Sequence, residues 1–155
     1  MEATLARRGK FPTDREKDRG AVVLIVERNP VLRRALYDGL GAAGYLGVTA
    51  CDQLHAEAVL RDIDQDLALA LVDDESWPLT ASARATLQHR WPTLPIVVVL
   101  ESGDPVLARR ARARGAAEVL TKPFDVPEVV RLADRLTGHA QPCHTPGFSL
   151  STMNR

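Results

Sequence analysis

Short, unbroken apolar segments rich in β-branched residues most strongly constrain the fold of this 155-residue chain. The three clearest segments are 21–26, 67–72 and 96–100, and two weaker ones are 46–50 and 117–121. Their apolar residues are consecutive rather than alternating, which is typical of strands buried on both faces of a parallel sheet. The segments therefore predict five strands of one parallel sheet.

Helical patterns separate these strands. Asn29 and Pro30 suit the N-cap and first turn of a helix, Leu36 and Leu40 recur on one of its faces, and Gly44 ends it.

Four further helices are expected. Leu54 and Ala58 mark the second, 80–90 the third and 104–115 the fourth, and the fifth begins at Asp125. Five strands alternating with five helices predict an α/β fold, a doubly wound sandwich around a parallel sheet.

Both ends of the chain lack this alternation. Residues 1–20 are rich in charge and predict a flexible, disordered arm, whereas 138–155 have no periodicity and predict a flexible tail. Residues 21–137 are then a single domain, and the eighteen tail residues are too few for a second folded unit.

Composition excludes several classes of protein. The chain has 20 basic and 20 acidic residues, so it lacks the basic excess of a nucleic-acid binder. No apolar run approaches the roughly 18 residues of a membrane helix, and charges occupy the place of a signal peptide's apolar segment. Cys51 and Cys143 are far apart without metal-type spacing, which fits a reducing cytoplasm.

Charged residues stand at the ends of the predicted strands, where ligands bind in doubly wound folds. Glu27 and Arg28 follow the first strand, Asp73 and Asp74 end the third, and Lys122 ends the fifth. Acidic residues opposite a lysine can hold a divalent metal and a phosphoryl group. The alternative is that these charges are merely solvated in loops.

Five motifs occur in a fixed order along the predicted elements. They are V-L-I-V-E-R-N-P at 23–30, G-Y at 44–45, L-A-L-V-D at 69–73, L-P-I-V-V-V at 94–99 and G-A-A-E-V-L-T-K-P-F at 115–124. With these motifs, the segment from about 21 to 136 resembles the receiver domain of bacterial response regulators. The resemblance implies a flavodoxin-like (βα)5 fold with a five-stranded parallel sheet.

The resemblance also implies residue roles. In the family a carboxylate accepts a phosphoryl group from a histidine kinase, two acidic residues after the first strand help to bind Mg²⁺, and a lysine pairs with the phosphoryl oxygens. Glu27 matches the first acidic position and Lys122 the lysine. The acceptor equivalent is Asp73 if the L-V-D motif sets the register, or Asp74 if the spacing to Pro78 does. We favour Asp73.

Three positions depart from the family pattern. Arg28 replaces the second acidic residue and cannot ligate a cation. Leu100 stands at the Thr or Ser position that senses the phosphoryl group, and Val119 at the aromatic switch position. We therefore expect no cofactor and, at most, weak binding of Mg²⁺ at a degenerate site that retains Glu27.

A specific hypothesis concerns the side chain of Arg28. We expect its guanidinium to reach across the pocket and pair with Asp73, Asp74 or Glu27, so that it neutralises the site without a metal. The alternative is that Arg28 only extends towards solvent.

The resulting functional hypothesis is a stand-alone atypical receiver, or pseudo-receiver, that acts as a protein-interaction module in bacterial two-component signalling and is not an enzyme. Its partner would be a histidine kinase or a downstream effector. The alternative is a receiver that is still phosphorylated at Asp73 or Asp74. A flavin or nucleotide binder is less favoured, because the loop after the first strand lacks phosphate-binding glycines.

The predicted fourth helix is rich in arginine. In the family this helix forms a partner-binding face with the fifth strand and fifth helix, and that face also allows a homodimer. An acidic partner is expected there, unless the arginines are simply solvated. They are Arg109, Arg110, Arg112 and Arg114.

Overall fold

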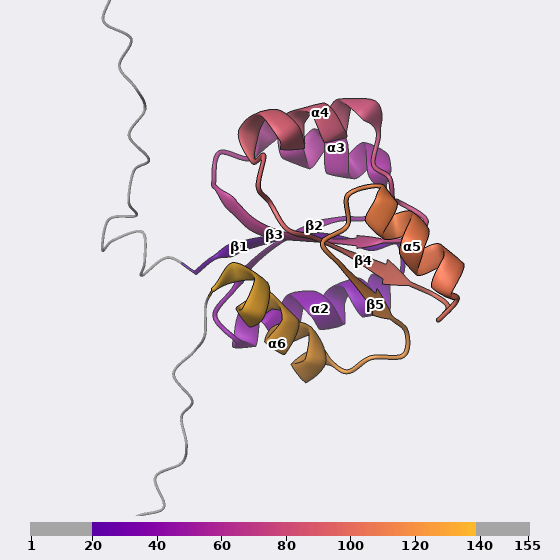
Figure 1. Ribbon diagram of the computed structural model, residues 1–155. Helices are drawn as coiled ribbons and strands as arrows, with labels where there is room; N and C mark the ends of the chain where they lie inside the picture. Colours follow the sequence, from indigo (N-terminus) through magenta and orange to yellow (C-terminus); the bar gives the residue numbers. More distant parts are fainter. Residues whose placement is uncertain (1–19, 139–155) are drawn as a thin grey trace, which may run out of the picture.

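A sheet of five parallel strands in the order β2-β1-β3-β4-β5 lies at the centre of the computed structural model, which describes residues 20–138 (Figure 1). The strands are β1 (Val22–Val26), β2 (Leu46–Ala50), β3 (Leu67–Asp73), β4 (Ile96–Leu100) and β5 (Glu118–Thr121). This order is that of flavodoxin-like folds, so the predicted fold class is confirmed. The predicted arm and tail lie outside the described residues, apart from residues 20 and 138.

Five helices connect or follow the strands. They are α2 (Pro30–Ala42), α3 (Gln53–Asp62), α4 (Ala81–Arg90), α5 (Pro105–Ala113) and α6 (Val126–Thr137). Within the described range, no helix combines the length and the apolar character that crossing a bilayer requires.

The ends of α2 follow the sequence signals closely. The side chain of Asn29 accepts hydrogen bonds from the amides of Val31 and Leu32, and Pro30 occupies the first turn. After the helix, Gly44 adopts a φ of 96°, in the left-handed region that favours glycine. The chain can therefore turn directly into β2.

The helices cover the sheet on two sides. α3, α4 and α5 pack on one face, and α2 and α6 pack on the other (Figure 1). Trp91 is buried between α4 and the sheet, whereas the half-buried Trp77 contacts both the α3–α4 cluster and the α5 cluster. The carboxyl ends of the strands are left uncovered between the helices, at one edge of the sheet.

The predicted second helix is present as α3, but one of the residues that mark it in the sequence lies outside the core. Leu54 is 73% exposed, and the residues of α3 that are buried against the sheet are Ala56 and Leu60. Asp52 caps the helix one residue before Gln53, and its side chain accepts a hydrogen bond from the amide of His55. Leu54 therefore indicates the helix but not its buried face.

Two glycines of α2 provide a matched test of the packing. A Cβ on Gly39 would lie 2.1 Å from Cγ1 of Val126 at the start of α6, whereas a Cβ on Gly41 would meet nothing within 4 Å. We expect Gly39→Ala to lower the free energy of unfolding by about 1–3 kcal/mol through overpacking. Gly41→Ala should raise it by about 0.4–1 kcal/mol by restricting the unfolded chain. Urea unfolding of both variants measures this, and equal shifts would contradict the close contact of α2 with α6.

Candidate functional site

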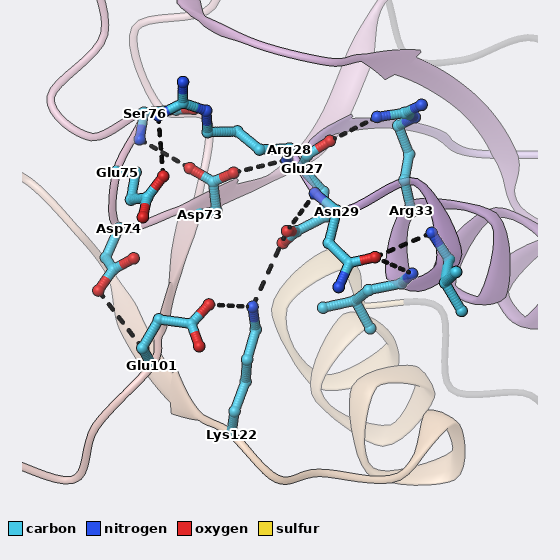
Figure 2. Close-up of polar contacts among 12 residues, drawn as sticks. Glu27, Arg28, Asn29, Arg33, Asp73, Asp74, Glu75, Ser76, Glu101 and Lys122 are labelled. Atoms are coloured by element: carbon cyan, nitrogen blue, oxygen red, sulfur yellow. Dashed lines mark hydrogen bonds and ion pairs between the residues drawn. The ribbon is translucent and has the colours of Figure 1, made fainter.

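The carboxyl ends of four strands bring the candidate site residues together (Figure 2). Glu27 follows β1, Asp73 ends β3, Glu101 follows β4 and Lys122 follows β5. Asp73 lies close enough to Glu27 and Lys122 to affect the pKa of each. Residues that are far apart in the sequence thus form one charged cluster.

Asp73 is buried, with 3% of its surface exposed. Its Oδ2 accepts a hydrogen bond of 2.8 Å from the main-chain amide of Arg28, and its Oδ1 accepts one of 2.7 Å from the amide of Ser76. Hydrogen bonds to a charged group contribute roughly 1.5–3 kcal/mol each. The carboxylate therefore joins the loop after β1 to the loop after β3.

Glu27 is buried to the same extent, with 3% of its surface exposed. Its Oε1 accepts a hydrogen bond of 3.1 Å from the amide of Asn29, and its Oε2 has no hydrogen-bond partner among the described residues. Burial raises the pKa of Glu27 above its ordinary value, although the Asn29 amide and Lys122 act in the opposite direction. The neutral form of this carboxyl is therefore favoured relative to a solvated glutamate.

Lys122 is held by two carboxylates. Its Nζ forms an ion pair and hydrogen bond with Oε1 of Glu101 and lies 3.8 Å from Oε1 of Glu27 (Figure 2). Burial lowers the pKa of Lys122, but Glu101 and Glu27 together outweigh burial and raise it. The ammonium is therefore already neutralised by acidic groups of the chain itself.

The expected pairing of Arg28 is wrong. Its guanidinium Nη1 contacts Oε2 of Glu75 at 2.8 Å, and both side chains are more than half exposed. Arg28 contacts Asp73 through its main-chain amide. Its side chain leaves the pocket towards the loop after β3 (Figure 2). An exposed ion pair contributes only about 0–1 kcal/mol, so the amide contact matters more here.

The two candidate acceptors occupy different places. Asp73 lies in the cluster with Glu27 and Lys122. Asp74 is half-buried, accepts a long hydrogen bond of 3.4 Å from the amide of Glu101, and lines a separate pocket beside Leu100. The structure therefore brings Asp73, rather than Asp74, next to the predicted lysine and the predicted acidic residue.

The substituted positions lie where the sequence pattern placed them. Leu100 is buried at the end of β4, pairs with Thr121 of β5, and its carbonyl accepts from the amide of Lys122. Val119 is half-buried in β5 and packs beside α5. The peptide bond between Lys122 and Pro123 is cis.

The carboxylates of the cluster offer a magnesium ion few oxygens that are free of hydrogen bonds. Mg²⁺ prefers octahedral oxygen ligation that usually includes one or two carboxylates. Both oxygens of Asp73 already accept main-chain amides, and Glu27 keeps a single unpartnered oxygen, Oε2. Among residues 20–138, no three His, Cys, Asp or Glu side chains are grouped so that they could hold a metal ion.

The arginines of α5 are all exposed, but they do not share one environment. Arg112 lies 3.5 Å from Glu118 of β5, which also pairs with Arg135 of α6. Arg110 and Arg114 line the pocket beside Asp74. These arginines of the predicted partner face therefore point to different sides of the helix.

Sequence reasoning missed the role of several polar residues. Glu101 pairs with Lys122, Ser76 donates its amide to Asp73, and Arg33 donates from Nη1 to the carbonyl of Glu27 at 2.8 Å. For Glu101 a signal was present, since it directly follows a predicted strand. The contacts of Ser76 and Arg33 depend on loop and side-chain conformations that no motif specifies.

Comparisons with known proteins agree on the type of fold. The response regulator protein FleR of Pseudomonas aeruginosa is 32% identical over 117 residues, which cover 74% of this chain and 24% of FleR. The transcriptional regulator NtrC of Salmonella typhimurium is 27% identical over 125 residues, covering 81% of this chain and 26% of NtrC. The chain thus spans about a quarter of the length of these relatives.

Solved structures show the same architecture. The chemotaxis response regulator CheY4 of Vibrio cholerae aligns with a TM-score of 0.65 and 24% identity, over 76% of this chain and 98% of CheY4. No family model matches the chain.

Glu27→Gln tests the electrostatics of the cluster. Because burial raises the pKa of Glu27, the folded state holds this proton at pH values where the unfolded state has lost it. The stability that wild type owes to the neutral carboxyl is present at low pH and is lost as the pH rises through the folded-state pKa. We expect Gln, which stays neutral, to become progressively stabilising relative to wild type over that range. Urea unfolding across a pH series measures the difference, and a pH-independent difference would refute the raised pKa.

Proposed function

We propose that this receiver domain, of bacterial response-regulator type in fold and sequence similarity, acts as a cytoplasmic protein-interaction module in two-component signalling. In this proposal it signals by binding a partner and does not use Mg²⁺-dependent phosphorylation of an aspartate. It is not an enzyme, and it needs no cofactor.

The observation that carries the proposal is that the predicted acceptor Asp73 and the predicted lysine Lys122 are already paired within the chain. Asp73 accepts two main-chain amides, and Lys122 is neutralised by Glu101 and Glu27. A phosphoryl group on Asp73 would have to replace these contacts, and residues 20–138 hold no group of three or more His, Cys, Asp or Glu side chains for a cation that would offset its charge. Asp73 and Lys122 therefore already have partners within the chain before any phosphoryl group arrives.

The substituted positions support the same proposal. Arg28 supplies a main-chain amide and an outward-directed guanidinium where a metal ligand would stand. Leu100 has no hydroxyl that could contact a phosphoryl oxygen, and Val119 has no aromatic ring. Each departure removes a different part of the mechanism that the family resemblance implies.

One observation favours the alternative, a receiver that is still phosphorylated at Asp73 or Asp74. Glu27, Asp73 and Lys122 remain close together at the strand ends. Their proximity is the minimum arrangement for accepting a phosphoryl group next to a lysine. The alternative would require a donor that displaces the amide of Arg28 or Ser76 from Asp73.

The expected partner is a histidine kinase or a downstream effector protein. The α5–β5–α6 face is the proposed contact region, and a homodimer through this face is a further form of the same proposal. Glu118 links Arg112 to Arg135 across this face, so part of its charge is already paired within the chain.

Phosphodonors test the proposed function directly. After incubation of the full chain with Mg²⁺ and acetyl phosphate, we expect the intact mass to be unchanged. Beryllofluoride should leave the amide NMR signals around Asp73 and Asp74 in place. A receiver domain that is readily phosphorylated, treated in parallel, is the positive control. A stoichiometric phosphoryl adduct would establish the alternative function.

Glu101→Ala tests whether Lys122 is held by an internal acid. Glu101 raises the pKa of Lys122 and burial lowers it. Removing Glu101 should therefore lower the pKa of Lys122. The chain has only three lysines, so a pH titration of their side-chain NMR signals can follow Lys122. Glu75→Ala removes another exposed, paired acid of the same edge and should leave Lys122 unchanged. Equal pKa values in wild type and Glu101→Ala would contradict the internal pairing.

A further inference from the structure

We propose that the pocket between β4 and α5 is a docking site for an acidic segment of a partner protein, which places a carboxylate-bearing side chain between Arg110 and Arg114. The inference rests on the proposed function as an interaction module, and it names the chemistry of the partner. The site lies beside the charged cluster of Figure 2 and shares none of the three residues Glu27, Asp73 and Lys122 with it.

The pocket has the size of a side chain rather than of a cofactor. Its volume is about 200 Å³, and cavities for drug-sized ligands are typically about 300–1,000 Å³. Its lining combines apolar side chains of β4 and α5 with Asp74, Trp77, Arg110 and Arg114. The apolar lining is Val98, Leu100, Leu107 and Ala111.

The charge of the pocket favours an anion. Arg110 and Arg114 are four residues apart, so they lie on one side of the helix, and neither forms an ion pair within residues 20–138. Asp74 is the one acidic residue of the lining, so two positive charges and one negative charge leave a net charge of +1. The α5 helix itself contains four basic residues when its C-cap Arg114 is included, and no acidic residue.

The pocket also has a donor that lacks an acceptor. Nε1 of Trp77 is buried and has no hydrogen-bond partner among the described residues. Asp74 does not accept a hydrogen bond from this Nε1. Its Oδ2 accepts from the amide of Glu101, and its Oδ1 is buried without a partner among the described residues. A carboxylate bound in the pocket would bring an acceptor close to the residue that carries this donor.

A glutamate-type side chain matches all of these properties. Its aliphatic stem suits the apolar walls, and its carboxylate suits paired guanidinium groups. Arginine and tryptophan are also the residues most enriched among those that dominate protein interfaces. The partner segment is therefore expected to be acidic, with a negatively charged residue as its anchor.

Two double variants of the full chain separate this pocket from general attraction to a basic helix. Arg110→Ala/Arg114→Ala removes the two guanidinium groups of the pocket. Arg109→Ala/Arg112→Ala removes the same charge from the same helix but outside the pocket lining. The probe is a short fluorescein-labelled peptide of alternating Glu and Leu, compared with the same peptide carrying Gln in place of Glu.

We expect fluorescence anisotropy to show that the Glu peptide binds wild type and that the Gln peptide does not. The pocket variant should weaken binding at least about tenfold, and the control variant less than about threefold. Equal losses in the two variants, or no binding of the Glu peptide to wild type, would overturn the proposal. Binding of phosphatidylserine vesicles in place of the peptide would also overturn it.

Tryptophan fluorescence gives a local readout. Trp77 and Trp91 are the only tryptophans, so Trp91→Phe leaves Trp77 as the sole reporter. The Glu peptide should then change Trp77 emission, and a saturating peptide that leaves emission unchanged would place binding elsewhere. These outcomes do not depend on phosphodonors, so failure of the docking site and failure of the proposed function can be told apart.

Discussion

Burial of ionisable groups at the strand ends is the constraint on which the site depends. A parallel sheet that is covered on both faces directs the ends of several strands to one edge, and Glu27 and Asp73 are almost completely buried there. A buried charge without partners would cost several kcal/mol, so each carboxylate must find donors nearby. The amides of Arg28, Asn29 and Ser76 donate to these carboxylates, Lys122 lies beside Glu27, and these contacts link the loops around the site.

Much of the fold could be predicted because its signals are local. The apolar runs of β2 and β4 give the observed bounds, and Asn29 with Pro30 marks the start of α2. Parallel strands of this kind leave little choice of topology. The buried face of α3 was harder to predict. Leu54 is a large apolar residue but is exposed, whereas Ala56 and Leu60 are buried.

The candidate site was only partly predictable. Position relative to the strands was sufficient to bring Glu27, Asp73 and Lys122 together, since the backbone determines where strand ends lie. The direction of the Arg28 side chain could not be predicted in this way, because a long flexible side chain can contact any of several nearby acids. Its pairing with Glu75 depends on the loop after β3, whose conformation is set by tertiary contacts rather than by a motif.

The two hydrogen bonds that Asp73 accepts have a consequence for how the chain tolerates change. In this domain the aspartate acts as part of the scaffold, since its side chain accepts the amide of Arg28 from one loop and the amide of Ser76 from another. Substitution at this position would loosen two loops at once, even in a protein that never carries a phosphoryl group. An acidic residue at position 73 can therefore be preserved by selection for loop order alone, and its presence by itself is weak evidence for phosphorylation.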